Sequence, residues 1–302
     1  MNADLLKSLY AQFVQYEAWL GKQKLSEHTK RAYKSRLNHF LVFLATATTD
    51  YSDVLHDSRA RTRAVEGYKH YLLDELDASP NSINTTLSSI DHFYKFLGFE
   101  TTGATREESQ KGAPQALTAE ELNRFLHAVQ RTESSKQRLL ALLLLRTGIR
   151  IGECAALNVD DVAVDQPQPT ITIRSQRKNR SRIISLEEST AAALREWLTD
   201  RAYRHRKSND RALFLNPQGK RISTAGLDLM LRKLGRQAGL QISAEVLRQT
   251  CLMTLLLSGK DVRTVARISG HKRLETTRRY CIPSITICED VNAPSTRTNT
   301  AG

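Results

Sequence analysis

The amino-acid sequence predicts a mainly α-helical protein with a small β-sheet, an α+β fold class, divided between two domains. Three features of its 302 residues predict this. Apolar residues recur at helical spacing through most of the first hundred positions. Residues 101–115 are rich in turn formers and interrupt that periodicity. Beyond them, alternating apolar residues at 170–173 and 182–186 predict two paired strands among further helices.

The first domain, residues 1–100, is expected to be a small bundle of amphipathic helices. Ser26 is placed to cap the second helix, and Pro80 precedes the fourth, so both positions favour a helix start. Each expected helix has apolar residues three or four positions apart on one face. The expected helices lie at about residues 5–20, 27–44, 60–76 and 81–97.

A linker is expected at residues 101–115 and a second domain at 116–282. Thr118 and Glu121 form a capping-box pattern at the start of the second domain's first helix. The C-terminal residues 283–302 contain prolines and many Ser and Thr residues, which predicts an extended tail.

The chain carries a net charge of +13, which predicts a polyanionic partner. The charge is uneven along the chain: residues 1–110 hold 13 Lys and Arg against 14 Asp and Glu, and the remainder holds 32 against 18. We therefore expect the second domain to provide most of the affinity for a nucleic acid.

Other classes of protein are disfavoured by what the sequence does not contain. No apolar run reaches the 18 residues of a membrane span, and the N-terminus is unlike a secretion signal, so we expect a cytoplasmic protein. No metal-ligand cluster and no Walker loop are found, so no cofactor is expected. Four cysteines lack metal-type pairing and are expected to be reduced, namely Cys154, Cys251, Cys281 and Cys288.

The stretch from residue 245 to 280 is the most informative about function. Ser243 is placed to cap a helix whose residues 251–257 are nearly all apolar, which predicts a helix buried on several sides. Arg248 is expected at the mouth of that core helix.

Three further side chains are expected near Arg248. A second helix should stop just before His271, and Tyr280 should follow on a third short helix. Arg150 comes directly after another buried helix. Two guanidinium groups can bind the oxygens of a phosphate, and a tyrosine phenolate can attack its phosphorus and store the bond energy as an ester. This group of residues therefore predicts phosphoryl transfer without a metal.

At these positions the sequence resembles the tyrosine recombinase (phage integrase) family. The family's first arginine box is similar to residues 147–153, Thr-Gly-Ile-Arg-Ile-Gly-Glu. Its second box is similar to residues 245–250, Glu-Val-Leu-Arg-Gln-Thr. Its last box is matched by Gly270-His271, Thr276-Thr277 and Tyr280. The resemblance extends over residues 10–280 and implies a helical domain that clamps DNA and a mixed catalytic domain.

The resemblance implies a site-specific recombinase that cleaves and rejoins DNA strands through a 3′-phosphotyrosine intermediate. Arg150 and Arg248 would stabilise the phosphate, His271 would hydrogen-bond to it, and Tyr280 would be the nucleophile. In the family, a lysine on a β-hairpin protonates the leaving 5′ oxygen. A gapless match puts Arg177 at that position, but arginine gives up a proton too reluctantly, so we choose the adjacent Lys178.

Two residues depart from the family pattern, because Glu245 and Gln249 stand where histidines are usual. An ionised Glu245 could accept the Tyr280 proton or orient an arginine, or it could be turned away with a purely structural role. The departures also leave open an alternative function, a catalytically weak or inactive DNA-binding regulator or architectural protein on the same scaffold.

Contacts with double-stranded DNA are expected from two basic groups. The first lies on the second helix, and the second lies in the hairpin between the two strands. A tetramer on two paired sites is expected, with the tail docking on a neighbouring protomer. The chain is more similar to a compact Xer-type or transposon-encoded enzyme than to an arm-binding integrase. The expected DNA-binding residues are Lys30, Arg31, Lys34, Arg174, Arg177 and Arg180.

Overall fold

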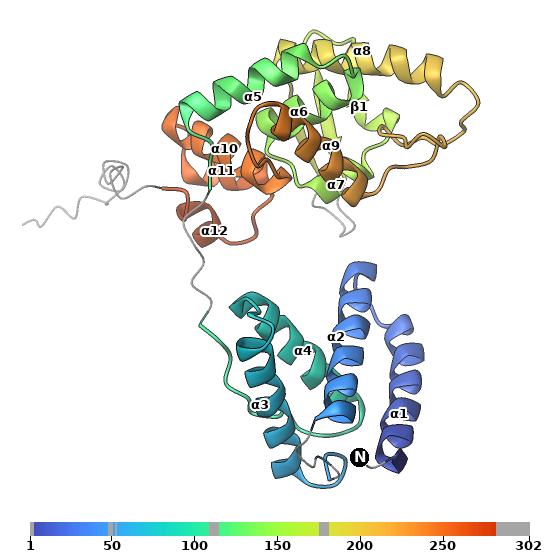
Figure 1. Cartoon of the computed structure of the whole chain (residues 1–302). Coiled ribbons are helices and arrows are strands. Elements are labelled where there is room, and N and C mark those ends of the chain that lie inside the picture. The colour runs from blue at the N-terminus through green and yellow to red at the C-terminus, as the bar shows by residue number, and fades with distance from the viewer. Residues whose placement is uncertain (1–2, 48–50, 52, 109–114, 175–180, 282–302) are drawn as a thin grey trace, which may run out of the picture. The chain divides into compact units, whose positions relative to one another are not determined.

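The computed structural model describes residues 3–47, 51, 53–108, 115–174 and 181–281. The chain forms two compact units, Met1–Lys111 and Gly112–Gly302 (Figure 1). Three of the expected DNA contacts or catalytic groups, Arg177, Lys178 and Arg180, lie outside the described residues, as does the tail.

The first unit consists of helices whose starts are capped by side chains. The oxygens of Ser26, Asp57 and Ser79 accept backbone N–H bonds that the first turns of α2, α3 and α4 leave unpaired. The cap expected at Ser26 is therefore confirmed. The helices are α1 (Ala3–Lys22), α2 (Glu27–Thr46), α3 (Ser58–Asp74) and α4 (Pro80–Phe96).

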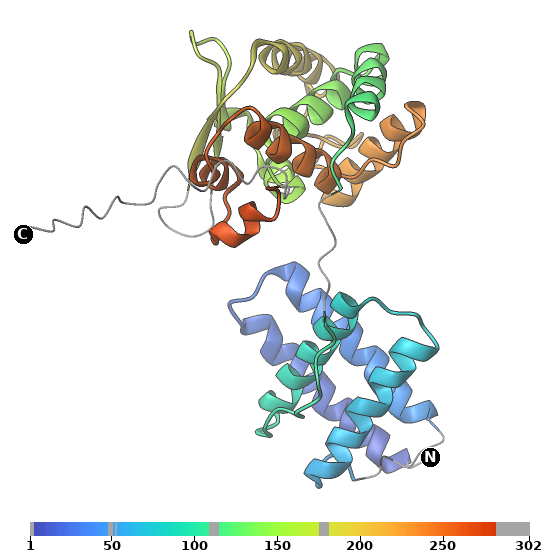
Figure 2. The ribbon, with the colours of Figure 1, turned by 90° about the vertical axis from the view of Figure 1, so that its left-hand side faces the viewer.

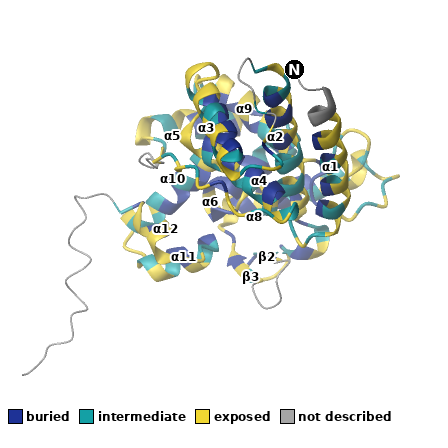
Figure 3. Ribbon diagram, turned by 90° about the horizontal axis from the view of Figure 1, so that it is seen from below, coloured by how far each residue is buried: buried dark blue, intermediate teal, exposed yellow. Residues whose placement is uncertain are grey.

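Aromatic side chains fill the core of this unit. Tyr16 and Phe93 are fully buried, and their rings meet edge to face with centroids 5.3 Å apart. Phe40 and Tyr68 form a second buried pair at 5.2 Å. In Figure 3, each of the helices α1 to α4 carries both buried and exposed residues, as expected for amphipathic helices. The predicted helical bundle is confirmed.

Part of the stretch that we expected to be a linker belongs to the first unit. Asp91 on α4 accepts hydrogen bonds from the backbone N–H of Thr102 at 3.2 Å and from Nη2 of Arg106 at 2.6 Å. The backbone N–H of Glu107 donates to Asn84 at 2.9 Å. Turn-forming residues thus mark the end of regular helix here, while the chain stays bonded to α4.

The second unit combines helices with a three-stranded sheet. The sheet order is β1-β2-β3 with antiparallel pairing, and Thr170 lies opposite Ser185. The expected hairpin of β2 and β3 is confirmed, and β1 is an addition. The strands are β1 (Val162–Ala163), β2 (Thr170–Ile173) and β3 (Arg182–Ser185). The helices are α5 (Ala119–Arg131), α6 (Ser135–Thr147), α7 (Ile151–Ala156), the 3₁₀ turn η1 (Val159–Asp161), α8 (Glu188–Arg204), α9 (Thr224–Gln237), α10 (Ala244–Leu257), α11 (Val262–Ser269) and α12 (Leu274–Arg278).

Helix α6 lies at the centre of this unit (Figure 2). Its leucines 139, 140, 143 and 144 are fully buried, and it packs mainly against α8 and α10. Gly148 ends α6 in the left-handed region, with φ of 60°. The side chains of Cys251 and Leu252 approach its Cα so closely that a Cβ would lie 3.2 Å from the Cys251 sulfur. The residues after α6 are thereby held against α10.

The expectation that α10 is buried on several sides holds as far as Leu252 and is wrong for residues 253–257. Cys251 and Leu252 are buried, but the helix then emerges from the core, and Leu257 is 64% exposed. Apolar composition alone does not distinguish a core helix from one with an uncovered apolar end. Among the described helices, none is long and apolar enough to cross a membrane.

Candidate active site

A cavity of about 240 Å³ lies between the end of α6, the first turns of α10 and the ends of α11 and α12. Five residues that the sequence analysis assigned a possible catalytic role line it, and three more complete its wall. The lining residues are Arg150, Glu245, Arg248, Gln249, His271, Thr276, Arg279 and Tyr280.

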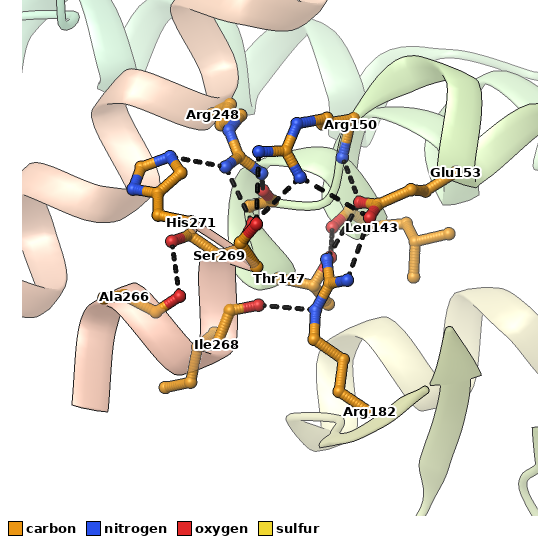
Figure 4. Close-up of polar contacts among 12 residues, drawn as sticks. Leu143, Thr147, Arg150, Glu153, Arg182, Arg248, Ala266, Ile268, Ser269 and His271 are labelled. Atoms are coloured by element: carbon orange, nitrogen blue, oxygen red, sulfur yellow. Dashed lines mark hydrogen bonds and ion pairs between the residues drawn. The ribbon is translucent and has the colours of Figure 1, made fainter. Parts of the chain in front are cut away.

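Arg150 is presented by the turn between α6 and α7. Its backbone N–H donates to Oε2 of Glu153 at 2.9 Å, which fixes the start of α7. Its side chain donates to the carbonyl of Ser269 at 3.3 Å (Figure 4). It also donates to the carbonyl of Gly270 at 3.3 Å. The guanidinium is thus held against the C-terminal end of α11, where carbonyl oxygens lack helical partners.

Arg248 is 2% exposed and lies one turn into α10. One terminal nitrogen donates to the carbonyl of Gly148, and the other donates to Ser269 O and to His271 Nε2, both at 2.8 Å. Burial, and then the positive charge of Arg150, lower the pKa of Arg248. An arginine side chain titrates far above neutral pH, so Arg248 remains a cation. Its guanidinium presents that charge through five N–H donors.

The hydrogen bonds of His271 define its tautomer. Gly270 ends α11 in the left-handed region with φ of 66°, and the His271 backbone N–H returns to Ala266 O at 2.9 Å. Because Arg248 can only donate, His271 Nε2 accepts, and Nδ1 then donates to Thr277 Oγ1 at 2.8 Å. Burial and the neighbouring arginines lower the pKa of His271 to about 4. The imidazole is therefore neutral near pH 7.

Tyr280 closes one side of the cavity and is 8% exposed. We expected Tyr280 to lie on α12, but it lies two residues beyond the end of that helix. Its backbone N–H donates to Thr277 O at 3.0 Å. Its ring stacks on His271 with centroids 6.3 Å apart and packs against Leu252. Burial, and then the charge of Glu245, raise the pKa of the phenol, while nearby arginines oppose the rise. The phenol is thus protonated at neutral pH and needs a proton acceptor to become a nucleophile.

A supporting ion pair lies behind the cavity, and the sequence did not reveal it. Arg182, the first residue of β3, binds both carboxylate oxygens of Glu153 at 2.8 Å, and its Nε donates to Ile268 O at 2.8 Å (Figure 4). Burial raises the pKa of Glu153, but hydrogen bonds from Arg182 and from the Arg150 backbone outweigh it, so the pKa is lowered. Glu153 thereby joins α7, β3 and α11.

The amino-acid sequence alone does not single out Arg182, because this residue lies at the end of a hairpin with many basic residues. Its one signal was its position at the start of the alternating strand. Gly270 also belongs to this arrangement, since a Cβ there would lie 2.9 Å from Nη1 of Arg182. Glycine is therefore required at the turn for its conformation and for the space it leaves.

The described residues that we expected to contact DNA are mostly paired with acidic groups. Lys30 lies 3.0 Å from Glu27, and Lys34 lies 3.3 Å from Glu17. Arg174 pairs with the buried carboxylate of Asp161. Arg31 is exposed on the same helix as the two lysines.

Comparisons with known proteins identify the family of the chain. The phage integrase family model matches residues 115–284, and the phage integrase N-terminal SAM-like domain matches residues 13–100. Tyrosine recombinase XerC of Roseiflexus castenholzii is 30% identical over 288 residues, which cover 88% of each protein.

Solved structures show a similar fold. The XerH recombinase bound to its difH substrate before cleavage has a TM-score of 0.69 at 19% identity, covering 92% of this chain and 85% of that chain. A lambda integrase tetramer bound to a Holliday junction has a TM-score of 0.65 at 15% identity, covering 90% and 76%. Since the two family matches extend over most of both units, the chain belongs to the phage integrase family, the tyrosine recombinases.

Proposed function

We propose that this chain is a site-specific DNA recombinase that cleaves and rejoins DNA strands through a 3′-phosphotyrosine intermediate. The observation that carries the proposal is the cavity itself, where one buried tyrosine faces a histidine and two arginines. A phenol beside two permanent cations suits an attack on a phosphodiester, because charge develops on the phosphate oxygens as phosphorus becomes five-coordinate.

In the proposed reaction, Tyr280 Oη forms a bond to phosphorus while the bond from phosphorus to the 5′ oxygen breaks. Arg150 and Arg248 stabilise the charge on the non-bridging oxygens. The phosphotyrosine ester conserves the energy of the broken bond, so rejoining is the same step in reverse and needs no nucleotide.

Two proton transfers must accompany cleavage. The phenol proton leaves Tyr280, and Glu245 is the carboxylate on the cavity wall that can accept it. The departing 5′ oxygen takes up a proton, which we assign to Lys178 on the hairpin, with Arg177 as the neighbouring alternative. His271 is neutral and orients Arg248 through Nε2, so the hydrogen bond to the phosphate that the family resemblance implies would require a second proton on the imidazole.

Double-stranded DNA is the proposed partner, bound by both units. The 32 Lys and Arg against 18 Asp and Glu in residues 111–302 provide the attraction to phosphates. Recombination exchanges strands between two sites, so we propose a tetramer on paired sites. The lambda integrase tetramer on a Holliday junction, whose fold is similar, supports this assembly. We further propose that residues 283–302 dock on a neighbouring protomer.

A nicked DNA substrate that traps the covalent complex tests the proposal. The parent chain is expected to form an adduct that survives denaturation. Tyr280→Phe is expected to bind the same DNA with unchanged affinity and to form no adduct, because only the phenol oxygen has been removed. Binding without any adduct in the parent chain would instead support the alternative DNA-binding regulator, and adducts in Tyr280→Phe would identify another nucleophile.

A further inference from the structure

The Gln249 side chain bonds to two parts of the second unit, the backbone at Gln115 and the side chain of Glu245. Its side-chain oxygen accepts the backbone N–H of Gln115, and its Nε2 donates to Oε1 of Glu245 at 3.2 Å. A backbone N–H can only donate, and an ionised carboxylate can only accept. The two partners therefore define which end of the amide points to which group.

The chain that enters the second unit is held by two consecutive residues of α10. Besides the bond to Gln249, the backbone N–H of Leu117 donates to Thr250 Oγ1 at 2.9 Å. That hydroxyl in turn donates to Val246 O at 2.8 Å, and Thr250 is buried. The entering segment is thus anchored on the helix that carries Arg248 and Glu245.

Without such a bond, the contacts around Glu245 would not hold its side chain in one rotamer. It lies in the first turn of α10, is exposed to solvent, and has a long side chain that can take several rotamers. Its place on the cavity wall brings it near Tyr280, whose pKa its charge helps to raise. The other charged or titratable groups facing it are Arg248 on α10, Arg150 before α7, His271 after α11 and Arg279 after α12.

We infer that Gln249 is a positioning residue that holds the Glu245 carboxylate toward Tyr280 and links it to the entering segment at Gln115. The inference rests on the proposed function, in which Glu245 accepts the phenol proton. Residues four positions apart lie on one face of a helix, so the amide can reach the carboxylate without distortion.

The chemistry of position 249 restricts which residues can do this. The side chain must accept from a backbone N–H and donate to a carboxylate at once. Glutamine does both, and a neutral histidine can do both through its two ring nitrogens. Methionine has nearly the length of glutamine and does neither, while glutamate accepts at both ends and adds a negative charge next to Glu245.

Single-turnover cleavage of the nicked substrate tests the inference. Gln249→Met is expected to slow cleavage about tenfold, since the Glu245 carboxylate is no longer held toward the phenol. Gln249→Glu is expected to slow cleavage at least as much, because its charge repels Glu245, and Gln249→His is expected to regain most of the rate. DNA affinity is expected to stay within about twofold of the parent value, because no basic residue has changed.

A double-mutant cycle distinguishes positioning from general support of the fold. In a Glu245→Gln background, Gln249→Met is expected to cause no further loss, since the carboxylate it served is gone. Gln115→Pro removes the N–H donor and also fixes φ at position 115, and its loss is expected not to be additive with that of Gln249→Met.

The inference is overturned if Gln249→Met cleaves at the parent rate. It is equally overturned if Gln249→Met causes the same loss in the Glu245→Gln background, or if Glu245→Gln itself cleaves at the parent rate. Failure of the proposed function is distinguishable from these results, because the parent chain would then form no adduct at all, and the inference would fall with it.

Discussion

The two arginines of the cavity differ in how firmly the fold holds them. Arg248 is 2% exposed and bonded to two carbonyls and a histidine, whereas the Arg150 side chain is 46% exposed and reaches two carbonyls at 3.3 Å. Removal of Arg248 therefore takes the donor from the buried Gly148 carbonyl, whereas removal of Arg150 takes a donor only from the more exposed Gly270 carbonyl, and Ser269 O keeps one donor in either case.

We predict that Arg150→Ala and Arg248→Ala each lower the single-turnover cleavage rate by about 10² or more, since each removes a cation aimed at the transition state. DNA affinity should fall far less, because many other cations share that interaction. Arg248→Ala alone should also lower the melting temperature. Arg150→Lys is the matched control, because it keeps the positive charge and loses the paired N–H donors of the guanidinium. Parallel losses of affinity and cleavage would contradict the assignment.

His271 makes a prediction about acid stability. Its pKa is about 4 in the fold, below the ordinary value of 6.5, so the unfolded chain binds the proton more readily. Its contribution to stability should therefore decline as the pH falls from 6.5 to 4. Denaturant titrations across this range should show a shallower decline for His271→Asn than for the parent chain. The exposed His127 provides the control, and an equal change in His127→Asn would refute the assignment.

At the level of residues, the sequence identified the reactive side chains, because each belongs to a motif in which such a side chain stands out. Arg150, Arg248, His271 and Tyr280 belong to boxes with recognisable order and spacing, so their meeting at one cavity could be expected. Supporting residues carry no such mark, because their partners are set by tertiary contacts. Arg182 and Gln249 were missed as partners for this reason: each bonds a backbone group far away in the chain, at Ile268 and at Gln115.

Among the elements, the junction of α7, β3 and α11 depends on the pair of Glu153 and Arg182. Both side chains are largely shielded, 21% and 15% exposed, and they form two parallel hydrogen bonds. We predict that Arg182→Met costs about 2 kcal/mol of unfolding free energy, since it leaves a partly buried carboxylate unpaired. Cleavage should slow about tenfold because Glu153 also caps the turn that presents Arg150.

Calorimetry and single-turnover cleavage would measure these two effects. The double variant Glu153→Gln with Arg182→Met is the informative control, because it removes the unpaired charge. It should recover part of the lost stability without recovering the rate. If Arg182→Met melted at the parent temperature, the pair would have no structural role.

The elements also show where sequence patterns fail. Helices α2 and α4 were located within a few residues because capping and apolar periodicity agree there. The burial of α10 was overestimated, because an apolar run records which side chains could be buried and not which neighbours cover them. Tyr280 was placed on a helix that ends at Arg278, and short helices have few hydrogen bonds to define their ends.

For the whole molecule, the charge distribution implies different contributions of the two units to DNA binding. The first unit is nearly neutral overall, and two of its three candidate DNA contacts are already in ion pairs, Lys30 with Glu27 and Lys34 with Glu17. A cation that keeps its acidic partner releases little counterion when it meets a phosphate. Arg31, which is exposed, should therefore contribute more to the salt dependence than its two neighbours.

Binding of the full chain to its DNA site, measured over a range of salt concentrations, tests this order. We predict that Arg31→Gln reduces the slope of log K against log salt by about 1, the value for one phosphate contact, while Lys30→Gln and Lys34→Gln reduce it by clearly less. In a Glu17→Gln background, Lys34→Gln should reduce the slope more than it does in the parent chain, because the carboxylate that competes with the phosphate is gone. Equal reductions in all three variants would mean that the ion pairs of α2 open when DNA binds, and an unchanged slope in all three would remove this helix from the DNA interface.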